Sequence, residues 1–220
     1  MSGSNFSVDG VLDALAAQPF RRGAGRALML VSARRGEGVT TAACAVAQAC
    51  KNSSVYAIDL NLKRNGLAKA LSEVAPLGPK QDGEFHGVSL FGAGSTVSPA
   101  FSYHQVGQTR IKVGLFDPRA VPPGARVMVP PGPSYWDAIR ATGGTAIVDA
   151  PSLDRSDIAL RVARHMDGVV LVVGAEAGAA PAATRAKQAL IDSGATLLGL
   201  VYAGADASAA LIERVLRRAV

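Results

Sequence analysis

The stretch Ala33-Arg34-Arg35-Gly36-Glu37-Gly38-Val39-Thr40-Thr41 decides the fold of this 220-residue chain. It follows the apolar run Ala27-Leu28-Met29-Leu30-Val31 and precedes a helix-like stretch at 42–49. A glycine-rich turn that ends in Gly-Lys-Ser/Thr, between a strand and a helix, is the pattern of a phosphate-binding loop. Every feature fits except Val39, which stands where the pattern has its lysine. We therefore expect a nucleotide-binding fold whose chemistry is altered or lost.

This loop contributes most of the candidate nucleotide-binding residues. Its glycines let backbone N–H groups point at phosphates, supported by the N-terminus of the following helix. The missing lysine would neutralise the charge of phosphoryl transfer, which a valine cannot do. Arg34 and Arg35 are candidate substitutes because guanidinium groups bind phosphate bidentately, and an exposed basic loop is the alternative. The predicted nucleotide-binding set is Arg34, Arg35, Gly36, Glu37, Gly38, Val39, Thr40, Thr41 and Asp59.

Two further apolar runs end in a carboxylate. One is Tyr56-Ala57-Ile58-Asp59, and the other is Thr145-Ala146-Ile147-Val148-Asp149. Ligands bind beyond the carboxyl ends of parallel strands, so both carboxylates are expected near the loop. Asp149 has the position of the Walker B acid, and with the Thr40 hydroxyl it forms the predicted Mg²⁺ site. A single aspartate at a strand end is often only a turn former, but three such strand ends in order favour a site.

Composition agrees with one α/β domain spanning 1–220. The chain is 49% hydrophobic and carries a net charge of +6, which favours anionic partners, with a solvated basic surface as the alternative. Cys44 and Cys50 are too far apart on one predicted helix to form a disulfide, which indicates reduced thiols and the cytoplasm. No apolar run is long enough to span a bilayer, and 1–7 lacks the build of a signal peptide.

Apolar runs alternate with helical patterns, which predicts an α/β fold with a doubly wound, mostly parallel sheet of the P-loop NTPase type. Residues 1–26 are expected to hold a leading helix and a basic segment, 75–110 a long variable loop, and the proline-rich 118–133 irregular chain. The predicted strands are 27–31, 55–60, 111–116, 145–148, 168–173 and 197–202, and the predicted helices are 8–17, 40–50, 67–74, 134–142, 156–166, 181–193 and 208–219.

With these motifs in place, the chain resembles the cytoplasmic domain of the bacterial tyrosine kinases (BY-kinases) that control polysaccharide chain length, within the MinD/ParA-like P-loop superfamily. The resemblance rests on 32–38, on Ile58-Asp59-Leu60-Asn61-Leu62-Lys63-Arg64, on Val148-Asp149-Ala150-Pro151 and on later stretches up to 203. Its Gly-Glu-Gly turn points to the kinase branch. The resemblance implies ATP or ADP with Mg²⁺ as ligands and a membrane-embedded partner.

Departures from the family pattern point to lost chemistry. Val39 stands where the family has its lysine, and Asn61 stands where the family has a second acid after the second strand. The amide of Asn61 cannot accept the proton of an attacking hydroxyl. Its adenine-contacting asparagine is matched by Ala203, and no tyrosine-rich tail follows. We therefore expect no catalytic residues at these degenerate positions and only weak binding of ATP or ADP with Mg²⁺.

The expected function is that of a catalytically inactive, tyrosine-kinase-like regulator of exopolysaccharide synthesis or export. One alternative is a MinD/ParA-like protein that localises a pilus, a flagellum or another surface machine. Another is a weak ATPase that uses Arg34 or Arg35 in place of the P-loop lysine.

The expected partner is a membrane chain-length or export protein of polysaccharide synthesis, which would place the chain in the cytoplasm or at the inner face of the cell membrane. The basic residues Arg34, Arg35, Lys63 and Arg64 are expected to dock an acidic segment of that partner. The predicted last helix, 208–219, would either pack on the sheet or lie on the membrane. A homo-oligomer is compatible with this interpretation, and no nucleic-acid partner is expected.

Overall fold

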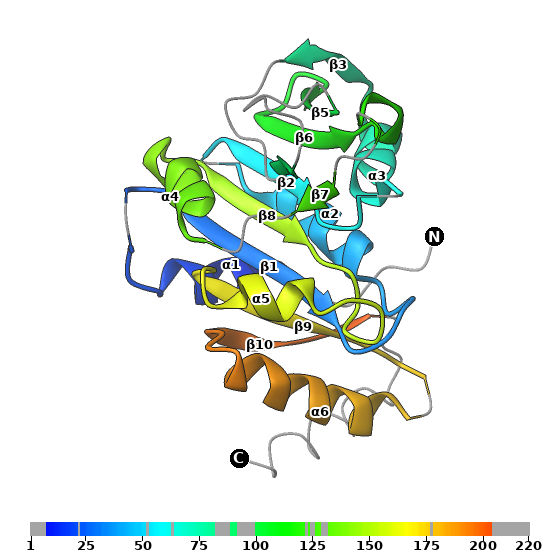
Figure 1. Ribbon diagram of the computed structural model, residues 1–220. Coiled ribbons are helices and arrows are strands. Elements are labelled where there is room, and N and C mark those ends of the chain that lie inside the picture. Colours follow the sequence, from blue (N-terminus) through cyan, green and yellow to red (C-terminus); the bar gives the residue numbers. More distant parts are fainter. Residues whose placement is uncertain are drawn as a thin grey trace.

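The computed structural model describes residues 8–21, 23–51, 53–62, 64–81, 89–91, 100–121, 123, 126–128, 132–176 and 178–203. In this part of the chain, helices cover both faces of a twisted sheet with the strand order β10-β9-β1-β8-β2-β6-β5-β3 (Figure 1). These strands are β1 (Arg26–Ser32), β2 (Val55–Asp59), β3 (Leu77–Gln81), β5 (Phe101–Val106), β6 (Ile111–Phe116), β8 (Thr145–Asp149), β9 (Gly168–Gly174) and β10 (Leu197–Ala203).

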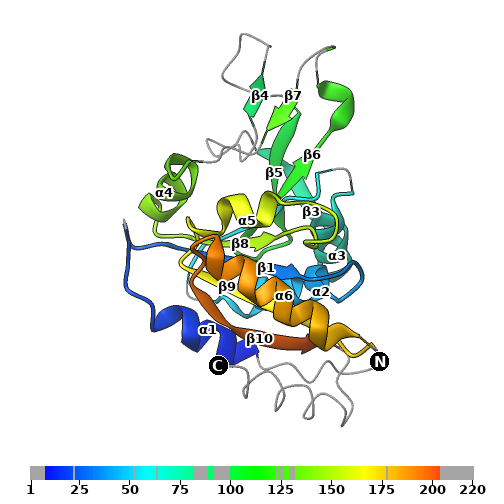
Figure 2. The ribbon, with the colours of Figure 1, turned by 60° about the horizontal axis from the view of Figure 1, so that its bottom comes forward.

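The helices are α1 (Val8–Ala16), α2 (Val39–Ala49), α3 (Gly66–Val74), α4 (Ser134–Ala141), α5 (Ile158–Ala163) and α6 (Ala179–Asp192), with a 3₁₀ turn at Pro118–Ala120. Strands β4 (Ser89–Phe91) and β7 (Arg126–Met128) form a separate antiparallel pair. Figure 2 shows this pair beyond the β5–β6 end of the main sheet.

The strands from β10 to β6 run parallel, and their central members are buried on both faces, as a parallel sheet requires. Side chains of β1 alternate between two cores. Met29 faces the core shared with α4, α5 and α6, whereas Leu30 faces the core shared with α1, α2 and α3. Leu30 and Asp59 both pair in register with Asp149, so β2 and β8 end at the same level and β1 ends two residues beyond it, at Ser32. The loops that follow them therefore meet at one edge of the sheet.

A buried ion pair fastens the opposite end of β1. Asp167 accepts a hydrogen bond from the backbone N–H of Ala27 at 2.6 Å and another from Nε of Arg140 at 2.9 Å. Arg140 is 1% exposed and also pairs with Asp137 at 2.9 Å. This cluster joins α4 to the starts of β1 and β9, and so fixes the strands whose other ends carry the loops.

The predicted fold class, a doubly wound and mostly parallel α/β sheet, is confirmed. The long loop expected at 75–110 is wrong in part, because β3, β4 and β5 lie within it. The first half of β5 has a period of two, with Phe101 and Tyr103 buried, and Val106 is buried at its end. A prediction based on glycine and proline content overlooks so short a pattern. The 118–133 stretch, expected to be irregular, includes the 3₁₀ turn and β7. The helix predicted at 208–219 lies outside the described residues.

No helix in the described ranges is both long and apolar enough to cross a bilayer.

Candidate functional site

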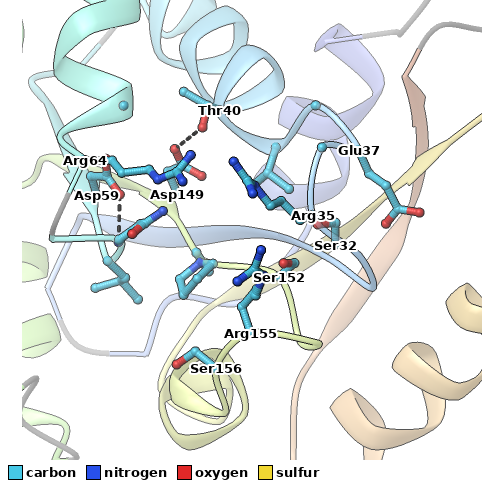
Figure 3. Close-up of a pocket in the computed structure, with 18 of the residues that line it drawn as sticks. Ser32, Arg35, Glu37, Thr40, Asp59, Arg64, Asp149, Ser152, Arg155 and Ser156 are labelled. Atoms are coloured by element: carbon cyan, nitrogen blue, oxygen red, sulfur yellow. Dashed lines mark hydrogen bonds between the residues drawn. The ribbon is translucent and has the colours of Figure 1, made fainter.

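A pocket of about 820 Å³ opens at the carboxyl ends of the central strands (Figure 3). Three loops line it: residues 32–40 after β1, 59–66 after β2 and 149–156 after β8. This is the edge where parallel α/β sheets bind their ligands. The pocket thus lies where the three motifs of the sequence predict a site.

The loop after β1 has the sharp turn that its glycines allow. Gly36 and Gly38 have φ angles of 89° and 86°, in the left-handed region that favours glycine. A Cβ at Gly38 would lie 2.9 Å from the Cβ of Ala203, so this position also lacks room for a side chain. Val39 begins α2 and is buried among the apolar residues of α1, α2 and β1. The position of the P-loop lysine is therefore occupied by a side chain of the core.

The two residues of the predicted Mg²⁺ site are in direct contact. The Thr40 hydroxyl donates a hydrogen bond of 2.7 Å to Oδ2 of Asp149 (Figure 3). The pKa of Asp149 is raised from 3.8 to about 7, mainly by burial and then by the charge of nearby Asp59, while the hydrogen bond from Thr40 lowers it. The carboxyl group is therefore close to half protonated at neutral pH, and a cation that bound there would displace a proton.

Asp59 braces the turn between β2 and α3. Its Oδ1 accepts the backbone N–H of Asn61 at 2.7 Å, and its Oδ2 accepts that of Leu67 at 3.2 Å. Burial raises the pKa of Asp59, and these backbone hydrogen bonds lower it. Asn61 is exposed at the rim of the pocket. The turn thus presents the Asn61 amide to the pocket, while both oxygens of Asp59 accept hydrogen bonds from its backbone.

Arg34 and Arg35 are adjacent in sequence but separate in space. Arg35 lines the pocket, whereas Arg34 pairs with the buried Glu37, Nε to Oε1, at 3.6 Å. The backbone N–H of Arg34 also donates to Oε2 of Glu37 at 2.9 Å. Glu37 therefore engages Arg34 within the loop itself.

Arg64 and Arg155 join Arg35 at the pocket, and all three are exposed. The sequence analysis missed Arg155. Its position could have indicated it, because Arg155 lies six residues after Asp149, in the loop that follows β8.

The structure brings most of the predicted site together. The predicted residues that line the pocket are Arg35, Gly36, Glu37, Gly38, Val39, Thr40, Asp59 and Asp149. Arg34 and Thr41 are not among the lining residues, and Thr41 is exposed on α2. Lys63 lies outside the described residues.

The residues present fit a nucleotide with Mg²⁺ only in part. Thr40 and Asp149 offer oxygen ligands, and Mg²⁺ is usually held by one or two carboxylates together with waters and substrate phosphates. Within the described ranges, no group of three or more His, Cys, Asp or Glu side chains could hold a metal ion. A bound cation would therefore need phosphate oxygens as further ligands. The lysine that normally helps to hold those phosphates is replaced here by Val39.

Comparison with known proteins supports the fold. No protein-family model and no curated protein matches the sequence. Apo McdA from Cyanothece has a similar structure, with a TM-score of 0.62, 14% identity and coverage of 88% of this chain and 81% of McdA. The kinase domain of VpsO gives a TM-score of 0.56 at 15% identity, with coverage of 82% of this chain and 85% of that domain.

MinD from Pyrococcus horikoshii, in complex with Mg-ADP, gives a TM-score of 0.54 at 18% identity, over 80% of this chain and 69% of MinD. Identities this low establish the fold and not the activity. The chain therefore has the same fold as McdA, MinD and the kinase domain of VpsO.

Proposed function

We propose that this chain is a degenerate, tyrosine-kinase-like P-loop protein that regulates exopolysaccharide synthesis or export through a membrane partner, without transferring phosphate. The proposal rests on the presence of Val39 at the position of the P-loop lysine. The side chain of Val39 is buried at the start of α2 and borders the pocket, so the loop has no cation at the position that contacts the β- and γ-phosphates. An apolar side chain there contributes nothing to the charge that develops in phosphoryl transfer.

The turn after β2 supports the same conclusion. A general base must hold a free proton-accepting group within hydrogen-bond reach of the attacking hydroxyl. Asn61 faces the pocket with an amide, and both oxygens of Asp59 accept backbone N–H groups of the turn. An amide cannot accept the proton, and Asp59 already holds the turn with both of its oxygens. The fold is thus kept while two separate parts of the chemistry are missing.

One observation favours a second candidate, a weak ATPase. Arg35 lines the pocket, so its guanidinium group could take the place of the lysine, whereas Arg34 is engaged by Glu37. In that case Thr40 and Asp149 would hold Mg²⁺, which would supply charge neutralisation to the bound phosphates. Phosphate release that Arg35→Ala removes and Arg34→Ala preserves would favour this candidate.

The main proposal is tested by complementing a deletion strain. The strain receives the unaltered chain, Asp149→Asn, or Asp13→Asn as an exposed control on α1, and its exopolysaccharide output is measured. We expect all three chains to restore the polymer equally, because no step depends on a bound cation. Loss of polymer with Asp149→Asn alone, at equal protein level, would instead indicate an enzyme. A deletion that leaves polymer unchanged and displaces a pilus or flagellum would favour the MinD/ParA-like localisation role.

A further inference from the structure

Three arginines from three different loops converge on the pocket. Arg35 follows β1, Arg64 follows β2 and Arg155 follows β8, and Figure 3 shows all three side chains directed into the same space. Among the described residues, none forms an ion pair with these guanidinium groups. By contrast, Arg140 is paired with Asp167, and Arg161 is paired with Asp157. The pocket therefore gathers three guanidinium groups that form no ion pair with a described carboxylate.

The acidic residues of the pocket have hydrogen-bond or ion-pair partners of their own. Glu37 faces Arg34, Asp59 accepts two backbone N–H groups, and Asp149 accepts the Thr40 hydroxyl. Like charges in one concave site repel each other and raise the local concentration of anions. The arrangement of side chains thus favours a ligand with several negative charges.

The backbone of the loop offers a second set of donors. Gly36 and Gly38 have left-handed φ angles, and the 11-residue helix α2 begins directly after them, at the pocket. Successive N–H groups in such a turn, together with a helix N-terminus, bind phosphate oxygens. A Cβ at Gly36 would meet no atom within 4 Å, so open space borders the loop there. Three forked guanidinium groups and this turn offer more donors than one phosphate group can accept.

We propose that the pocket binds a di- or triphosphate in its metal-free form, with Arg35, Arg64 and Arg155 in the charge-neutralising role that lysine and Mg²⁺ have in P-loop enzymes. The inference rests on the proposed function only in that the ligand is held and not turned over. A phosphate chain fits better than an acidic protein segment because the donors line a pocket and include a glycine turn. Recognition is through phosphate, since Ala203, at the matched adenine-contacting position, has no side-chain hydrogen-bonding group.

The test is calorimetry on the full chain with inorganic triphosphate and with ATP, each in EDTA and then with excess Mg²⁺. We expect both ligands to bind in EDTA and to bind more weakly with Mg²⁺, because the metal removes negative charge from the phosphates. Affinity for ATP above that for triphosphate would assign the site to a nucleotide, and equal affinity to an inorganic polyphosphate. Binding of ATP without any binding of triphosphate would overturn the proposal.

Single substitutions give a sharper test. Arg35→Ala, Arg64→Ala and Arg155→Ala should each weaken triphosphate binding by about tenfold to a hundredfold, the loss expected for one hydrogen bond to a charged group. Arg161→Ala, exposed on α5, is the matched control and should change nothing. Thermal melts show that each variant is folded.

Binding that requires Mg²⁺ and survives Arg64→Ala and Arg155→Ala would overturn this inference and leave the proposed function intact. Salt-sensitive binding of polyglutamate, with no phosphate binding, would assign the arginines to an acidic protein segment instead. Failure of the proposed function would be seen separately, as phosphate release or as loss of polymer with Asp149→Asn.

Discussion

Replacing Asp149 with asparagine is expected to stabilise the protein at and above neutral pH. The carboxyl group is 5% exposed, lies near Asp59 and accepts one side-chain hydrogen bond, from Thr40. These surroundings raise its pKa from 3.8 to about 7, a shift of about 3 units. At about 1.4 kcal/mol per unit, the ionised form costs the folded state up to about 4 kcal/mol relative to the unfolded chain.

The sign of the pH dependence follows from the direction of the shift. The pKa of Asp149 is higher in the folded chain than in the unfolded one, so its stabilising contribution is complete below about pH 4 and is lost as the pH rises through 7. Between pH 5 and 7, this group lowers the free energy of unfolding by about 1.4 kcal/mol per pH unit, and it has little further effect above pH 8. Asparagine does not titrate, and its amide oxygen can still accept the Thr40 hydroxyl.

The assay is urea unfolding at pH 5, 6, 7 and 8, followed by the fluorescence of Trp136, which is the one tryptophan of the chain and is fully buried. The free energy of unfolding of Asp149→Asn, relative to that of the unaltered chain, should rise by about 3 kcal/mol from pH 5 to pH 8. Asp13→Asn, at an exposed position, should follow the unaltered chain throughout. Parallel pH profiles for Asp149→Asn and the unaltered chain would refute the reasoning.

Three further substitutions have defined outcomes. Val39→Lys should tighten ATP binding by about tenfold or more, because it adds one charge-assisted contact, but it should not produce hydrolysis. Calorimetry measures the affinity, and a phosphate-release assay measures hydrolysis. An unchanged affinity would show that the loop does not bind phosphate. Asp167→Asn should lower the free energy of unfolding by up to about 3–5 kcal/mol, since it removes the more buried of the two carboxylates that pair with the buried Arg140; a loss no larger than that of Asp13→Asn would contradict this. Gly38→Ala should cost about 1–3 kcal/mol in urea unfolding, given a φ of 86° and a Cβ 2.9 Å from that of Ala203, and an unchanged midpoint would count against that strain.

The sheet and the centre of the site could be predicted because their signals are local. Strands β1, β2 and β8 read as short apolar runs that end at a glycine turn or an aspartate, and parallel pairing brings such ends to one edge. The contact between Thr40 and Asp149 follows from that topology. Strand β5 was missed because its alternation lies next to residues rich in glycine, proline and serine.

The directions of the arginine side chains could not be predicted. Arg34 and Arg35 are equivalent in sequence, and the partner that separates them, Glu37, is set by the turn of the loop. Arg155 reaches the pocket because the loop after β8 returns past the P-loop, where the backbone N–H of Arg35 lies 3.5 Å from Oδ2 of Asp154. Contacts between loops depend on tertiary structure, which the periodicity of one sequence does not encode.

The hydrogen bonds of Asp59 have a consequence for how such chains change over generations. This carboxylate holds the start of α3 through the N–H of Leu67 as well as the turn at Asn61. A lineage can exchange its P-loop lysine for valine and lose nucleotide affinity and turnover while it keeps its fold, but a change at Asp59 also loosens the tertiary structure. Purifying selection on stability would then preserve an ancestral motif in a gene that no longer encodes a catalyst. If the proposed function is correct, a genome survey that counts working kinases by their strand-end aspartates would wrongly include this chain.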